Sequence, residues 1–117
     1  MDRQQIGKDA EAQAERFLQN KGLTPISRNF RCRCGEIDLI MRDGNELVFI
    51  EVRKRQWQQF GGAAESVDFR KQRKLIRTAQ YYLQQLPREP FCRFDVIAFE
   101  GKAAADEPLW YKDAFRV

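Results

Sequence analysis

Residues 36–53 read EIDLIMRDGNELVFIEVR, in which two runs rich in apolar residues flank Asp43-Gly44-Asn45. An Asp-Gly step between two such runs is typical of a β-hairpin. We therefore expect strands over 36–42 and 46–53. The second run is apolar on both sides of Glu51, as in a central strand that is buried on both faces.

Five further elements are predicted outside this hairpin. The elements expected outside it are a helix over 6–21, a strand over 25–33, a helix over 66–86, a strand over 92–100 and a short strand over 109–111. Ser66 is the expected N-cap of the second helix, and Pro87 its stop. The order α-β-β-β-α-β predicts an α/β domain in which helices flank a mixed central sheet.

The composition fits one soluble domain over residues 1–117. The chain has 117 residues, 21 Lys and Arg against 17 Asp and Glu, and a net charge of +4. No apolar run approaches the roughly 20 residues of a membrane span, and the polar start does not resemble a signal peptide. We therefore expect a cytoplasmic protein with no membrane partner.

Histidine is absent from the sequence, and its three cysteines form no CxxC pair. These counts exclude Ser-His-Asp and Cys-His catalysis, His-ligated metals and a four-thiolate zinc site. We expect the cysteines to be reduced thiols. Any chemistry must then come from carboxylates, Lys, Arg, Tyr or a hard metal ion.

The turn sets the register of the hairpin. If Asp43-Gly44 forms a two-residue turn, Arg42 pairs with Asn45, and Glu36 lies opposite Glu51. Because side chains alternate along a strand, the acidic residues of both strands then share one face.

Three carboxylates, those of Glu36, Asp38 and Glu51, are expected on this face. Carboxylates so placed repel each other and lose solvation, so they favour a compensating cation. Without histidine, the ion best suited to oxygen ligands is Mg²⁺ or Mn²⁺. The alternative is that Glu36 is solvated and that Glu51 pairs with Arg53 or Arg55.

Glu11 lies on the edge of the apolar stripe of the first predicted helix, four residues after Gly7 and three before Ala14. This position allows its carboxylate to point at the sheet. The alternative is a solvated glutamate in a helix rich in Glu and Gln.

A basic stretch begins the second predicted helix. Its members are Arg70, Lys71, Arg73, Lys74 and Arg77. Cations near a helix start oppose the helix dipole, which favours a use in binding phosphate, with help from Arg53, Arg55 and Trp57. Lys71 stands four residues before apolar Leu75, so we expect it to face inward. The alternative is an ordinary solvated face.

Together these motifs resemble the PD-(D/E)XK, or restriction-endonuclease-like, nuclease superfamily. Its signature, an Asp followed by (D/E)-x-K on the next strand, corresponds to Asp38 and residues 51–53. The chain is more closely similar to the YraN-like family of small bacterial proteins, through GEIDLI at 35–40, FIEVRKR at 49–55 and RFDV at 93–96.

The resemblance implies an αβββαβ core and a metal-dependent DNA endonuclease. Its metal ligands would be Glu36, Asp38 and Glu51, and its catalytic residues Glu11, Asp38, Glu51 and Arg53. Kinship with Holliday-junction resolvases implies branched or junction DNA as the substrate and favours a homodimer.

One departure from the pattern is Arg53, which stands where the superfamily has a catalytic Lys. Arg stays protonated and mainly binds phosphate oxygens, whereas Lys can release a proton. Lys54 cannot simply replace it, because its side chain should point to the opposite face. Two alternatives to an enzyme therefore stay open: a noncatalytic nucleic-acid-binding module, and a protein-interaction scaffold whose carboxylates are salt-bridged.

Overall fold

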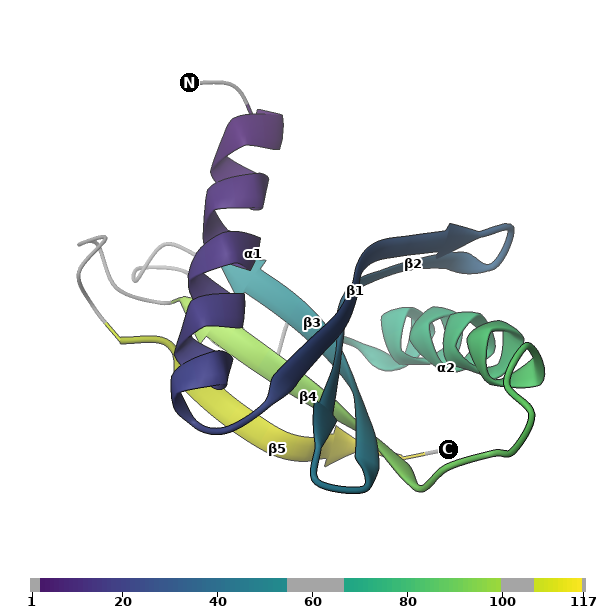
Figure 1. The fold of residues 1–117 in the computed structure, drawn as a ribbon. Helices are drawn as coiled ribbons and strands as arrows, with labels where there is room; N and C mark the ends of the chain where they lie inside the picture. The colour runs from purple at the N-terminus through teal and green to yellow at the C-terminus, as the bar shows by residue number, and fades with distance from the viewer. Residues whose placement is uncertain (1–2, 55–66, 100–106, 117) are drawn as a thin grey trace.

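A computed structural model describes residues 3–54, 67–99 and 107–116, and it contains one sheet and two helices (Figure 1). The elements are α1 (Arg3–Asn20), β1 (Thr24–Cys32), β2 (Gly35–Asp43), β3 (Glu46–Lys54), α2 (Phe69–Gln84), β4 (Cys92–Phe99) and β5 (Leu109–Phe115). Neither helix, over the residues that the structure describes, is long and apolar enough to cross a membrane.

The sheet is mixed, with its five strands in the order β1-β2-β3-β4-β5. Antiparallel pairs join β1 to β2, β2 to β3 and β4 to β5, while β3 and β4 run parallel. The parallel pair requires a crossover connection, and α2 lies within it. The expected fold class is confirmed, and the architecture is consistent with a restriction-endonuclease-like core.

Each helix covers a hydrophobic cluster of its own on the sheet. The α1 cluster contains Ala10, Ala14, Leu18, Leu23, Leu39, Met41, Val48, Ile50, Ile97 and Phe99. The α2 cluster contains Ile37, Ile40, Leu47, Phe49, Val67, Leu75, Ala79, Phe94 and Val96. Neighbouring residues of β3 alternate between the two clusters, which confirms that this strand is buried on both faces.

The predicted register of the hairpin was wrong. Asp43 pairs with Glu46, so the turn residues are Gly44 and Asn45 and not Asp43 and Gly44. Gly44 has a φ of 63°, and Asn45 has no positive φ. A type II′ turn places its glycine first of the two central residues, whereas the prediction placed it second. The shift moves Glu36 away from Glu51 along the hairpin.

The first half of β2 pairs with β1 but not with β3. The pairing of β2 with β3 runs only from Asp43 to Leu39, and Ile37 lies in the same cluster as Ile40, so simple alternation fails there. Beyond this point β2 continues with β1 alone, and Figure 1 shows this part of the ribbon lying beside α2. A Cβ on Gly35 would come within 3.1 Å of Thr78 Oγ1 of α2, so the ribbon packs closely on the helix.

Helix α2 begins later than the sequence indicated. The N-cap is Asp68, whose carboxylate accepts a hydrogen bond from the Lys71 N–H at 2.9 Å. Ser66, the predicted cap, lies outside the described residues. An Asp cap supplies both an acceptor and a negative charge at the helix start, where both are stabilising.

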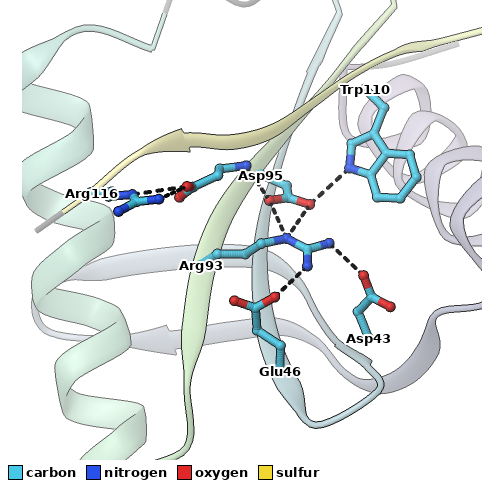
Figure 2. A network of polar contacts seen from close by, with 7 residues as sticks. Asp43, Glu46, Arg93, Asp95, Trp110 and Arg116 are labelled. Carbon is cyan, nitrogen blue, oxygen red and sulfur yellow. Dashed lines mark hydrogen bonds and ion pairs between the residues drawn. The ribbon is translucent and has the colours of Figure 1, made fainter.

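A buried ionic network fastens the hairpin turn to the far strands (Figure 2). Asp95 is fully buried and accepts hydrogen bonds from Arg93 Nε at 3.0 Å and from Trp110 Nε1 at 2.9 Å. The same guanidinium donates to Glu46 at 2.7 Å and lies 3.0 Å from Asp43. The network therefore joins β4 and β5 to the two residues that close the β2–β3 turn.

Candidate metal and nucleic-acid site

Asp38 lies where β2 and β3 separate. Its Oδ2 accepts a hydrogen bond from the Val52 N–H at 2.8 Å, so a side chain replaces the backbone acceptor that β2 no longer offers. Burial raises the pKa of Asp38 above its ordinary value, the Val52 N–H opposes this, and the charge of Glu36 adds to it. The carboxylate of Asp38 is thus buried at the point where β2 and β3 separate.

Glu51 is the most buried carboxylate near this split, at 5% exposed. Its Oε1 lies 3.5 Å from Arg53 Nη1 and 3.9 Å from Lys71 Nζ, both long for charge-assisted hydrogen bonds. Its Oε2 is buried and has no hydrogen-bond partner among the described residues. Burial, and then the charge of Asp38, raise the pKa of Glu51 to about 8. The described part of the chain therefore leaves one carboxyl oxygen of the site without a hydrogen-bond partner.

Two cations approach the carboxylates from different elements. Arg53 comes from β3, two residues beyond Glu51, and Lys71 comes from the first turn of α2. The inward orientation predicted for Lys71 is confirmed. The Asp68 cap fixes the helix turn that carries Lys71, so its ammonium is held over the sheet face.

Glu36, the third predicted carboxylate of the hairpin, is engaged elsewhere. Its Oε2 lies 3.0 Å from Arg31 Nε on β1, and its side chain is 39% exposed. Its charge still acts on the pKa of Asp38. Neither interpretation of the sequence included this ion pair of Glu36. The contact between Glu51 and Arg53 that the alternative predicted is present, and Asp38 lies close to Glu51 as the metal-site interpretation predicted.

Glu11 of α1 lines a separate cavity of about 200 Å³. Glu15 also lines this cavity and forms a bidentate ion pair with Arg28, in which Nε lies 2.7 Å from Oε1 and Nη2 lies 2.8 Å from Oε2. Neither Asp38 nor Glu51 contributes to this lining. Within the described ranges, no group of three or more His, Cys, Asp or Glu side chains is placed to hold a metal ion. The structure therefore brings two of the four predicted acidic residues together.

The remaining predicted residues form an exposed row on α2. Its members are Arg70, Arg73, Lys74 and Arg77. Arg55 and Trp57, which were predicted to assist them, lie outside the described residues. Sequence reasoning missed Phe69, the first residue of α2, which is exposed beside this row. The available signal was an aromatic residue directly before the basic stretch.

Comparisons with known proteins show the family of this chain. Residues 10–99 match the model described as uncharacterised protein family UPF0102. A UPF0102 protein of Pseudomonas savastanoi is 54% identical over 97% of this chain and 94% of its own length. Another, from Methylobacillus flagellatus, is 52% identical over 95% of this chain and 96% of its own length. The YraN-like resemblance is confirmed at this level.

Proposed function

The chain belongs to the uncharacterised protein family UPF0102, and we propose that it is a metal-dependent nuclease that hydrolyses phosphodiester bonds in DNA. The observation that carries the proposal is the buried, unpartnered Oε2 of Glu51 beside the carboxylate of Asp38. A protein gains nothing in stability from such a pair, because both charges are desolvated and repel each other.

The donor set suits a small, hard divalent ion. Mg²⁺ sites commonly use one or two carboxylates and complete the shell with water and substrate phosphates, so Asp38 and Glu51 are sufficient. When bound, such an ion lowers the pKa of a water ligand and stabilises charge on the phosphate. Glu36 could join only by releasing Arg31, which makes it a secondary ligand at most.

The cations of the site are suited to hold phosphate. Arg53 stays protonated, so its role is to bind phosphate oxygens and to limit the repulsion between the carboxylates. Lys71 carries an amine, as the superfamily's catalytic Lys does, and its Nζ lies 3.9 Å from the same Glu51 oxygen that Arg53 approaches. We therefore assign to Lys71 the role that the superfamily gives to the Lys at the position of Arg53.

DNA is the proposed substrate because of the exposed row on α2. Its four cations continue from the site along one helix and would follow a phosphate backbone without reading a base sequence. Membership in the PD-(D/E)XK superfamily and the resolvase-like homodimer belong to the same proposal.

Cleavage assays with Mg²⁺ and Mn²⁺ on single-stranded, duplex, flap and four-way-junction DNA test the proposal. We expect metal-dependent cleavage of at least one substrate by wild type and none by Asp38→Asn. Glu107→Gln, a change at an exposed carboxylate, is the matched control and should cleave like wild type. No cleavage of any substrate by wild type would contradict the enzymatic proposal.

The second candidate is a noncatalytic DNA-binding module, and Arg53 is the observation that favours it. On this account the α2 row binds DNA while the site has lost efficient hydrolysis. The same experiments distinguish the two, because a binding module retains metal-independent binding without cleavage.

A further inference from the structure

Phe69 is a large apolar side chain that is exposed beside a charged site. It is the first residue of α2, and it is 71% exposed. The guanidinium of Arg73, one helical turn along, lies 5.7 Å from the centre of its ring. One face of the ring is thus occupied by a cation, and most of the ring is open to solvent.

Stability does not explain this residue. An exposed ring buries little apolar surface, and Ala has a higher helix propensity than Phe. Asp68 caps the helix through its own carboxylate, with no contribution from the ring of Phe69. The change Phe69→Ala should therefore leave the fold intact.

Phe69 lies in the same first turn of α2 as Lys71, which contacts the candidate site. Lys71, two residues further along the same turn, approaches Glu51 on the inner side of the helix. The two side chains leave the helix on different sides, and a helix with its side chains is only about 10 Å wide. A strand whose phosphate lies at Lys71 would pass the helix start within reach of Phe69.

We infer that Phe69, backed by Arg73, is a stacking platform for an unpaired base, so that the substrate class of the site is nucleic acid with unpaired bases. Every base has a face that can stack on an aromatic ring, and Arg adds a cation–π contribution. Bases inside a duplex are already stacked on their neighbours and cannot reach the ring. The inference rests on the proposed function, because it assumes a nucleic-acid strand at Lys71.

The test compares two probes, single-stranded oligothymidylate and a duplex of equal length, by fluorescence anisotropy at one fixed salt concentration. Phe69→Ala should weaken binding of the single strand about tenfold and leave duplex binding unchanged within about twofold. Phe69→Trp should retain wild-type affinity for the single strand. Phe91→Ala is the matched control, because Phe91 is 84% exposed but lies at the other end of β3, where its carbonyl accepts from the Leu47 N–H. It should bind both probes like wild type.

The outcomes separate this inference from the proposal on which it rests. If wild type binds the probes and Phe69→Ala binds the single strand equally well, the stacking platform is wrong and the nuclease proposal is untouched. An equal loss for both probes would also overturn the platform. If Phe69→Ala behaves as expected but wild type cleaves no DNA with Mn²⁺, the platform is supported and the enzymatic proposal fails. A wild-type protein that binds neither probe would overturn the platform, whereas the nuclease proposal would still be decided by the cleavage assays on flap and four-way-junction DNA.

Discussion

Glu51→Gln is the substitution whose effect follows most directly from the structure. The folded protein holds the proton of Glu51 up to about pH 8, whereas an ordinary glutamate releases it near 4.5. Between these values the native state binds a proton that the unfolded chain has lost. The stability of the metal-free protein should therefore fall as pH rises through this window, and the full penalty applies above pH 8.

The magnitude follows from the pKa difference. Each pKa unit corresponds to about 1.4 kcal/mol, and the pKa of about 8 already includes the favourable charges of Lys71 and Arg53, so the rise from 4.5 gives a penalty of roughly 4–5 kcal/mol. Gln has nearly the shape of a protonated Glu and carries no charge. Glu51→Gln should thus lie within about 1 kcal/mol of wild type near pH 5 and exceed its stability by roughly 4 kcal/mol at pH 8.

Urea denaturation from pH 5 to pH 8, in the presence of a chelator, measures this difference. Wild type and variant share all other titrating groups, so the difference between their curves isolates Glu51. Glu107→Gln, at an exposed position, is the control and should follow wild type at every pH.

The opposite result would refute the reasoning. If Glu51→Gln is less stable than wild type by a few kcal/mol across the whole range, Glu51 is an ionised structural partner of Arg53 and Lys71. The substitution would then have left a half-buried cation without its partner. In that case the site is a salt bridge and needs no metal.

Three further predictions concern Arg53, the exposed row on α2 and the buried ionic network around Asp95. Arg53→Lys adds a second amine beside Lys71, at the superfamily's usual position, and should raise Mn²⁺-dependent cleavage severalfold; a loss of cleavage would show that the guanidinium itself is required. Reversing Arg70, Arg73 and Arg77 to Glu should weaken DNA binding across all sequences and flatten its salt dependence, while a folded triple variant that binds normally would reduce the row to a solvated face. Asp95→Ala leaves buried donors without their acceptor and should lower the free energy of unfolding by about 3–5 kcal/mol, and a change below about 1 kcal/mol would contradict the anchoring role of the network.

Hydrophobic patterns were sufficient to predict the elements of this fold. The run LVFIEV predicted a doubly buried strand, and β3 alternates between the two clusters. The apolar residue Leu75, from which the orientation of Lys71 was predicted, is also buried. These predictions succeeded because burial acts on every residue of an element and tolerates errors of a residue or two at its ends.

The positions of the site residues depended on the turn register, on where β2 and β3 separate and on the rotation of α1, none of which a hydrophobic pattern determines. The register depended on which turn position Gly44 occupies, and the pairing of β1 with β2 places Glu36 opposite Arg31. The hydrogen bond from Val52 to Asp38 occurs where the pairing of β2 with β3 has ended, and the hydrophobic pattern of β2 does not mark that point. Glu11 could be placed on a helix edge but not at a cavity, because the spacing within a helix does not fix its rotation over a sheet.

Mn²⁺ binding by electron paramagnetic resonance tests the central claim most directly, because it needs neither substrate nor turnover. Wild type should bind one Mn²⁺ per chain at about pH 8, and more weakly below it, because the ion must displace the proton of Glu51. Asp38→Asn should abolish this binding, and Glu107→Gln should preserve it. No bound Mn²⁺ in wild type, or equal binding by Asp38→Asn, would contradict a metal site at Asp38 and Glu51.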